Sequence, residues 1–369
     1  MYYIVFILVI IGVIKESFTG RRSVKLFNII FLILTLMSVF RYGQGTDYFS
    51  YEHEYKYLIM TWEHIKSGKD SGYLLLVMIG QYIKLPFEYF IGIIASFVMF
   101  IWYQFLRKEC NFSFLALLLF YVLLFFVNIN SAIRNSIAFA VYLYWAYPCL
   151  INNKIIKYIF IVILASFFHL SLLILVFLPL FRNIVTNNTR LYIILFSFIL
   201  MFFGIEWIIP ILPSFLRNRI DLYIYSYQVN DNFIYARIIR IFYIIPIIYL
   251  IRTQSENSMT WEKYNFFIGT FFFYSLFSFS TDVSSRIFAY CIPFLCIILS
   301  RSNLNLTTIR KYIILYYMLI LNVIFFKNFV EFSKQGAYDQ NISWYNFPYT
   351  SIFNKEEVSK IRETTFYIE

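Results

Sequence analysis

Apolar runs close to the length of a membrane-spanning helix recur from Met1 almost to Val330. A helix needs roughly 20 apolar residues to cross a hydrocarbon core of about 30 Å. Hydrophobic residues make up 61% of the 369 residues and charged residues 14%, against roughly 45 to 50% and about 25% in soluble proteins. The pattern therefore predicts an all-α, polytopic integral membrane protein, with a membrane domain over residues 1–330 and a polar tail over residues 331–369.

The apolar runs predict about 12 transmembrane or half-membrane helices. Two stretches do not fit single spans: Tyr73–Leu85 is too short to cross, and Ile155–Phe181 is long for one helix and short for two. The remaining helices are expected at Met1–Ile14, Leu26–Phe40, Phe87–Leu106, Phe112–Val127, Ser136–Ile151, Leu191–Ile209, Ile234–Ile251, Tyr264–Phe279, Ile287–Ser300 and Tyr312–Phe326.

Basic residues predict which loops face the cytoplasm, because Lys and Arg are retained there in short loops. All of these loops fall on one side if Tyr73–Leu85 does not cross and if Ile155–Phe181 is a hairpin with its tip near His169. The loops expected inside carry Lys15, Arg21, Arg22, Lys25, Arg107, Lys108, Lys154, Lys157, Arg182, Arg190, Arg252, Lys263, Arg301, Arg310 and Lys311.

The same topology places several polar segments on the outer side of the membrane. They are residues 41–72, 128–134, 210–233, 281–286 and the tail, and the first should include an interfacial helix near Tyr51–Lys66. The net charge of +11 fits cytoplasmic loops in a membrane protein, so it does not indicate nucleic acid as a partner. The four cysteines have no zinc-site or CxxC spacing and are expected to be packing residues.

The most specific polar segment is Arg41-Tyr42-Gly43-Gln44-Gly45-Thr46-Asp47-Tyr48 at the outer end of the second helix. Two glycines permit a tight turn, and exposed backbone N–H groups beside a guanidinium suit a phosphate-like anion. The alternative is an interfacial Arg that caps its helix before an ordinary turn. Asp47 either pairs with Arg41 or is a base held nearby.

Three further residues sit at outer helix ends or within apolar runs, where a charge is costly unless it is paired or functional. Arg134 and Arg286 either extend to lipid headgroups or share an anionic ligand with Arg41, since only Asp47 and Asp282 stand out as compensating carboxylates. His169 is either a packing residue or a general base. Glu206 is a second, weaker carboxylate candidate.

These residues resemble the pattern of the EpsG and Wzy-type polymerases, in the order Arg41, Gly45-Thr46-Asp47-Tyr48, Arg134, Phe168-His169-Leu170-Ser171 and Arg286. The resemblance covers most of the membrane region, and the Gly-Thr-Asp-Tyr and Phe-His-x-Ser runs are its specific parts. Two departures are Asn135, where a Gln is expected, and Ser71-Gly72-Tyr73, where relatives carry an acidic residue and Pro before the Gly and aromatic residue.

The resemblance implies a GT-C-like membrane glycosyltransferase that extends O-antigen or another surface polysaccharide without a metal or other cofactor. Its donor would be a growing glycan on undecaprenyl diphosphate and its acceptor a lipid-linked repeat unit, at the periplasmic face of a bacterial inner membrane. A chain-length regulator and a flippase are possible partners. The catalytic residues would be His169 or Asp47, and the diphosphate or glycan would be bound by Arg41, Gly45, Thr46, Tyr48, Arg134, Asn135 and Arg286.

Two other functions remain open at this stage. An O-antigen ligase uses the same donor, although its key residues are usually concentrated in one large late loop. A lipid-linked oligosaccharide flippase or other transporter usually has paired repeats and intramembrane carboxylates, of which this sequence offers few.

Overall fold

The computed structural model describes residues 1–45, 47–67, 70–184, 186–203, 238, 240–253, 261–278, 281–301, 308–334, 349 and 351–353. Regular structure in these ranges is helical, apart from one isolated backbone bridge between Arg41 and Ser351. The prediction of an all-α fold is therefore confirmed for the described residues. The chain divides into two compact units, which are Met1–Leu172 with Asn303–Glu369, and Leu173–Ser302.

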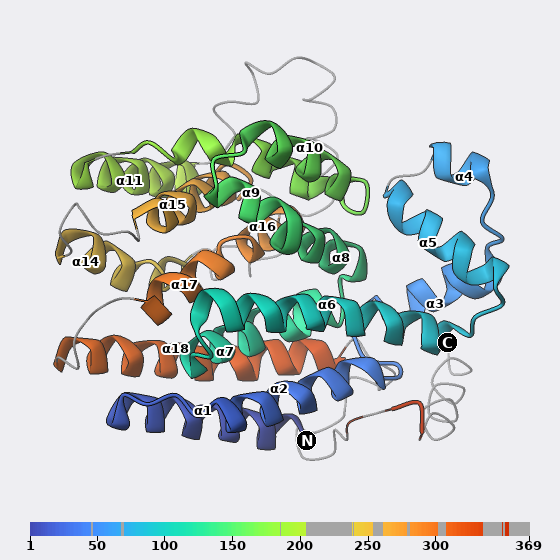
Figure 1. Cartoon of the computed structure of the whole chain (residues 1–369), viewed down its shortest axis with the longest axis horizontal. Coiled ribbons are helices and arrows are strands. Elements are labelled where there is room, and N and C mark those ends of the chain that lie inside the picture. Colours follow the sequence, from blue (N-terminus) through green and yellow to red (C-terminus); the bar gives the residue numbers. More distant parts are fainter. Residues whose placement is uncertain are drawn as a thin grey trace. The chain divides into compact units, whose positions relative to one another are not determined.

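The first unit is built around long apolar helices that lie side by side (Figure 1). Ring packing holds them together: Phe6 stacks on Phe325 with centroids 4.0 Å apart, and Trp102 is fully buried. These helices are α1 (Tyr2–Thr19), α2 (Val24–Val39), α6 (Phe87–Cys110), α7 (Phe114–Phe120), which continues as the π-helix η1 (Tyr121–Ile129), and α18 (Thr308–Lys334).

A second set of helices in this unit follows η1. It consists of α8 (Ile133–Val141), the π-helix η2 (Tyr142–Ala146), α9 (Tyr147–Ile151) and α10 (Ile155–Ser166). A π-helix leaves backbone carbonyls available to other partners, and such segments often lie near functional sites. In η1 the carbonyl of Val122 accepts a 2.8 Å hydrogen bond from Asn328 of α18, and η1 ends at the turn that carries Asn130.

Three short helices gather at one end of α6 (Figure 1). They are α3 (Tyr48–Tyr57), α4 (Trp62–Ser67) and α5 (Ser71–Tyr82). The 12 residues of α5 cover only about 18 Å at 1.5 Å per residue, so this helix does not cross a bilayer, as predicted. The interfacial helix predicted near Tyr51–Lys66 is present as two helices, α3 and α4.

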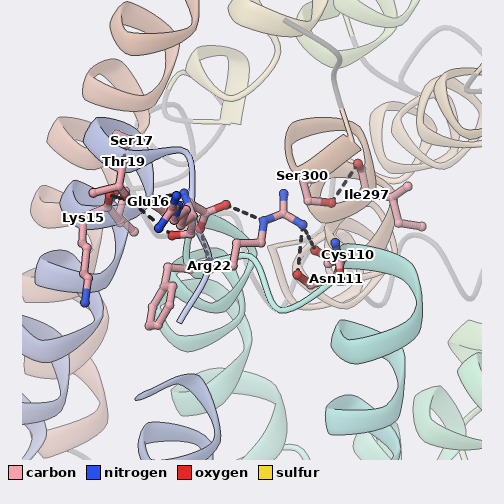
Figure 2. Close-up of polar contacts among 12 residues, drawn as sticks. Lys15, Glu16, Ser17, Thr19, Arg22, Cys110, Asn111, Ile297 and Ser300 are labelled. Carbon is pink, nitrogen blue, oxygen red and sulfur yellow. Dashed lines mark hydrogen bonds and ion pairs between the residues drawn. The ribbon is translucent and has the colours of Figure 1, made fainter. Parts of the chain in front are cut away.

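At the opposite end of the first unit a partly buried ion pair joins two turns (Figure 2). Arg22 Nε donates to Glu16 Oε1 at 2.8 Å, and Arg22 Nη1 donates to the carbonyls of Cys110 and Asn111 at 3.0 and 2.9 Å. The other carboxylate oxygen of Glu16 accepts the N–H of Phe114 at 2.7 Å. This single pair therefore joins the α1–α2 and α6–α7 turns and satisfies a free N–H at the start of α7.

The ion pair also shows how charge is distributed along this unit. The loop after α1 carries Arg22, the last turn of α6 carries Lys108, and Lys311 Nζ lies 5.9 Å from the ring centre of Phe18 at the same end. Arg41 follows α2 at the other end. These three basic residues, which the sequence placed on one side of the membrane, are thus gathered at one end of this unit.

Among the described residues, four helical stretches are long and apolar enough to cross a membrane, namely Tyr2–Thr19, Phe87–Cys110, Val283–Ser300 and Lys311–Phe329. Shorter apolar helices cover other predicted spans. The break predicted near His169 is present, because α10 ends at Ser166 and the 3-10 helix η3 (Leu170–Phe181) begins after His169. The number of about 12 helices and the GT-C-like architecture remain predictions.

The second unit consists of helices packed around α15. Each side-chain nitrogen of its buried Arg190 donates a hydrogen bond, and the acceptors are Asn265 Oδ1, Asn187 Oδ1 and the Ile184 carbonyl. The described helices are the rest of η3, α11 (Asn187–Phe203), α14 (Ile245–Thr253), α15 (Trp261–Leu276), α16 (Thr281–Ala289) and α17 (Ile292–Arg301). The predicted outer loop 210–233 and Glu206 lie outside the described residues.

Candidate functional site

Arg41 is buried directly after α2, with 2% of its surface exposed. Its Nη1 donates to the Ser38 carbonyl at 3.0 Å and to Asn130 Oδ1 at 3.1 Å, and Ser38 Oγ donates to the same Asn130 oxygen at 2.7 Å. One side of the guanidinium thus caps α2 and binds the η1–α8 turn. The described partners of Arg41 are Ser38 and Asn130, so a pair with Asp47 is not formed.

The other side of this turn holds buried donors without partners. Arg41 Nε, Gln44 Nε2 and the Tyr48 hydroxyl have no hydrogen-bond partner among the described residues, and all three residues are at most 2% exposed. A buried donor left unpaired costs about 1–3 kcal/mol. Three such donors within eight positions of one turn can donate to a ligand that carries oxygen acceptors.

Gly45 allows this turn to lie against the η1–α8 turn. Its φ is +110°, and a Cβ atom at this position would lie 2.3 Å from the carbonyl oxygen of Asn130. Only glycine fits such an approach. The Gly45 backbone therefore positions the Arg41 turn against Asn130, which also binds the guanidinium.

The described part of the C-terminal tail borders the same turn. The N–H of Ile352 donates to the Phe40 carbonyl at 3.0 Å, and the Tyr349 hydroxyl donates to the Met37 carbonyl at 2.9 Å. Tyr2, Tyr48 and Tyr349 lie close enough to Arg41 for its charge to act on their phenol groups. Aromatic side chains therefore surround the buried guanidinium.

Arg134, in the first turn of α8, is the centre of a second polar cluster. Its Nη2 donates to Glu54 Oε2 at 2.5 Å, and its Nη1 lies 3.5 Å from Asp70 Oδ2. The guanidinium carbon lies 4.8 Å from the ring centre of Tyr73 and 5.3 Å from that of Tyr51. Arg134 is therefore paired on its edge and covered by aromatic rings.

His169 joins this cluster through Asp70. Its Nδ1 lies 3.6 Å from Asp70 Oδ1, and neither ring nitrogen has a direct hydrogen-bond partner among the described residues. Burial raises the pKa of Asp70, but His169 and the charge of Arg134 more than offset this, so the pKa lies below its ordinary value. Asp70 is therefore a carboxylate at neutral pH.

The two clusters lie at the same end of the first unit. Arg41 is bound by Asn130 in the turn that leads into α8 and Arg134, and both arginine charges act on Tyr51. Arg41, Arg134 and His169, which are far apart in the sequence, are thus brought to one region. We call this region the polar end of the first unit.

The other residues predicted for the site contact these two clusters less directly or lie elsewhere. Asp47 immediately precedes α3, and Asn135 is buried and donates to Asn128 Oδ1 at 2.9 Å, which braces the turn. Arg286 lies in α16 of the second unit, and its convergence with Arg41 and Arg134 stays a prediction. Thr46 lies outside the described residues.

The sequence analysis missed Glu54 and Asp70. It assigned only Asp47 and Asp282 as compensating carboxylates, whereas Arg134 is paired with Glu54 and Asp70. One signal was available: Asp70 directly precedes Ser71-Gly72-Tyr73, where relatives were expected to carry an acidic residue. Glu54 carried no comparable signal, because its pairing depends on how α3 packs.

No group of three or more His, Cys, Asp or Glu side chains that could hold a metal ion occurs in the described part of the chain. All four cysteines are buried as free thiols.

The apolar helices and the polar end define a multi-helix membrane protein with buried arginines beside a histidine. The sequence model of the EpsG family matches residues 24–351 of the 369, and the chain therefore belongs to the EpsG family. Comparison with the curated proteins and with the solved structures found no match. Family membership supports a role in polysaccharide polymerisation, with an activity like that of a glycosyltransferase.

Proposed function

We propose that this chain is a Wzy-like polymerase that extends O-antigen or another surface polysaccharide at the periplasmic face of a bacterial inner membrane. It transfers a growing glycan from undecaprenyl diphosphate to a lipid-linked repeat unit, without a metal or cofactor. The observation that carries this proposal is the group of buried, unpaired donors of Arg41, Gln44 and Tyr48, because a diphosphate or glycan supplies the oxygen acceptors they lack.

Arg41 is the principal diphosphate ligand in this proposal. A guanidinium offers a planar fork of donors that matches phosphate oxygens, and Arg41 Nε is the donor that no described residue uses. Gly45 and Thr46 supply backbone N–H groups, while Tyr48 contacts the glycan or diphosphate. Arg134 with Asn135, and Arg286 in the second unit, complete the predicted binding set.

The reaction is a displacement at the anomeric carbon of the donor. An acceptor hydroxyl oxygen forms the new glycosidic bond, the bond from the anomeric carbon to the diphosphate oxygen breaks, and the diphosphate leaves with the electron pair. A base, His169 or Asp47, takes the hydroxyl proton. The positive charge of Arg41 stabilises the negative charge that develops on the leaving diphosphate.

The proposed partners follow from this chemistry. The donor and the acceptor are both undecaprenyl-diphosphate-linked, so the bilayer delivers each of them to the outer end of the protein. A flippase supplies the repeat units, and a chain-length regulator limits the polymer. No step involves nucleic acid.

The test is replacement of Arg41 in a strain whose own copy is deleted. Arg41→Ala should reduce polymer extension by about 10²- to 10³-fold, the usual cost of one donor to developing charge. Arg41→Lys should recover only part of the activity, because it keeps the charge and loses the fork. The measurement is the length distribution of surface glycan on a gel, with chain level checked by immunoblot.

Arg21→Ala is the matched control, since Arg21 is exposed at the opposite end of the first unit. Normal polymer length from Arg41→Ala at normal protein level would refute the proposal. A ligase is distinguished in the same strain, because its loss leaves long polymer on the lipid carrier, whereas loss of a polymerase leaves single repeat units.

A further inference from the structure

The guanidinium of Arg134 has different partners from that of Arg41. Arg134 is paired with Glu54 at 2.5 Å and with Asp70 at 3.5 Å, and the rings of Tyr51 and Tyr73 cover its faces. Two carboxylates offset the charge of the guanidinium and occupy its terminal nitrogens. Both terminal nitrogens of Arg134 thus face carboxylates, only its Nε is left without a described partner, and its Nη1 contact holds Asp70.

Asp70 is also held by the backbone. It has φ +61°, a left-handed conformation, and its carbonyl accepts the N–H of Tyr73 at 2.9 Å. The backbone at Leu170 contributes to lowering the pKa of this carboxyl, and the N–H of Gly72 donates to the Phe167 carbonyl at 2.9 Å. The turn before α5 and the turn around His169 are therefore joined on both sides of Asp70.

Gly72 is required for this contact. A Cβ atom there would lie 3.2 Å from the backbone carbonyl carbon and oxygen of Phe167, which is tighter than ordinary van der Waals contact. Strain at functional sites persists only where the surroundings fix it. The left-handed Asp70 followed by this glycine thus places a carboxylate beside the imidazole of His169.

The ring of His169 is oriented towards this carboxylate. Its Nδ1 faces Asp70 Oδ1 at 3.6 Å, and its side chain is 12% exposed. Catalytic hydrogen bonds are often long without substrate and shorten in the complex. If Nδ1 is directed at the carboxylate, Nε2 is left to accept a proton from another group.

We infer that His169 is the base that takes the proton of the acceptor hydroxyl, and that Asp70, itself held by Arg134 and Glu54, is the residue that positions it. This inference rests on the proposed polymerase function and decides between the two bases left open above. The proton passes from the hydroxyl oxygen to His169 Nε2, while Asp70 stays ionised and stabilises the imidazolium. This inference changes the role of Arg134 in the proposed binding set: Arg134 acts through Asp70 in place of a direct diphosphate contact.

The charged and titratable groups around His169 come from three elements packed together. The titratable and charged groups facing this cluster are Tyr51 and Glu54 of α3, Asp70 and Tyr73 at the start of α5, and Arg134 of α8.

The experiment uses membranes that hold the full-length chain, given lipid-linked repeat units extracted from the strain in which the gene is deleted. Asp70→Asn should lower kcat on the order of 10²-fold with little change in KM, within the range of general-base catalysis. The acidic limb of its pH–rate profile should change from that of the wild type, because the carboxylate 3.6 Å from His169 Nδ1 is gone. His169→Gln should lose at least as much activity and have no acidic limb.

A double variant separates positioning from mere structural support. Residues that act as one unit have non-additive effects, so Asp70→Asn with His169→Gln should be no slower than His169→Gln alone. Asp70→Glu should restore part of the kcat because it keeps the carboxylate. The exposed Glu63→Gln in α4 is the matched acid-to-amide control.

The two proposals fail in different ways. If wild-type membranes extend no glycan under conditions where the pathway is complete, the proposed function is wrong. If the wild type is active and Asp70→Asn keeps both its kcat and its pH profile, then the assignment of His169 and Asp70 is wrong. The assignment is also wrong if the fold-loss of kcat in the double variant equals the product of the fold-losses in Asp70→Asn and His169→Gln. A third outcome also contradicts the assignment: kcat falls in Asp70→Asn, Asp70→Glu does not restore it, and the acidic limb of the Asp70→Asn pH–rate profile is the same as in the wild type.

Discussion

At the scale of single residues, the two arginines of the polar end have different surroundings despite similar positions in the sequence. Each lies at a helix end and each keeps an Nε without a described partner, yet Arg41 bonds to neutral oxygens, whereas Arg134 meets two carboxylates. Burying a lone charge costs several kcal/mol unless it is partnered or functional. The unpaired Arg41 is therefore the better candidate for an anionic ligand.

Asp70 should make the stability of the protein depend on acid pH. Its folded-state pKa is lowered from the ordinary 3.8, so its contribution is fully present above that value and is lost as the pH falls through the lower, folded pKa. The melting temperature of the detergent-purified chain should fall on acidification below about pH 4. Asp70→Asn should show a shallower fall, and an identical slope in both proteins would contradict this.

The residues of the site were only partly predictable. Arg41, Arg134 and His169 were found because a charge or imidazole in an apolar run is conspicuous. Glu54 lay in a polar segment where acids are ordinary, so nothing local distinguished it from Glu63, and the signal for Asp70 was its place directly before Ser71-Gly72-Tyr73. Their importance arises only when α3 and α5 pack against α8, and that contact is a property of the tertiary structure.

At the scale of elements, most helices follow the apolar pattern, because helix length and hydropathy are set by the bilayer. The predicted segments Leu26–Phe40 and Phe87–Leu106 correspond to α2 and α6, with ends that differ by a few residues. The π-helical stretches η1 and η2 were not predictable, since they arise from how neighbouring helices engage the backbone. The turns at Gly45 and Asp70 are likewise fixed by packing.

Gly45→Ala should destabilise the Arg41 turn. The residue has φ +110°, and an added Cβ would meet the Asn130 carbonyl at 2.3 Å, so the cost should be about 1–3 kcal/mol. Activity should fall as well, because Asn130 also binds Arg41. Thermal unfolding of the purified chain measures the effect.

Gly20→Asn is the matched control for this substitution. Gly20 has φ +66° at the end of α1, a left-handed conformation that asparagine accepts. It should unfold close to the wild-type temperature. Equal melting temperatures for Gly45→Ala and wild type would show that the turn can shift away from Asn130.

At the scale of the whole molecule, the sequence predicted a membrane protein of this family, and family membership confirms it. Within the first unit Arg22, Lys108 and Lys311 gather at the Glu16–Arg22 end, and the short helices α3, α4 and α5 lie at the polar end. The positive-inside rule then predicts that the polar end faces outward. The relation of Arg286 to this end involves the second unit and is a prediction from family resemblance.

Cysteine labelling tests this orientation. The four native cysteines are buried, so they should give little background with a membrane-impermeant maleimide. Ile59→Cys, at a position 82% exposed between α3 and α4, should be labelled in cells whose inner membrane is intact. Asn152→Cys, exposed between α9 and α10, should be labelled only after that membrane is opened, and the reverse pattern would invert the topology.

The pairing of the tail with the end of α2 has a consequence for biosynthesis. Tyr349 bonds to Met37, 312 positions earlier in the chain, so the surroundings of Arg41 are finished only after nearly the whole polypeptide has left the ribosome. A nascent or prematurely terminated product would hold the early helices without this closing contact. The cell would then have a built-in delay between insertion of the protein and the onset of its activity.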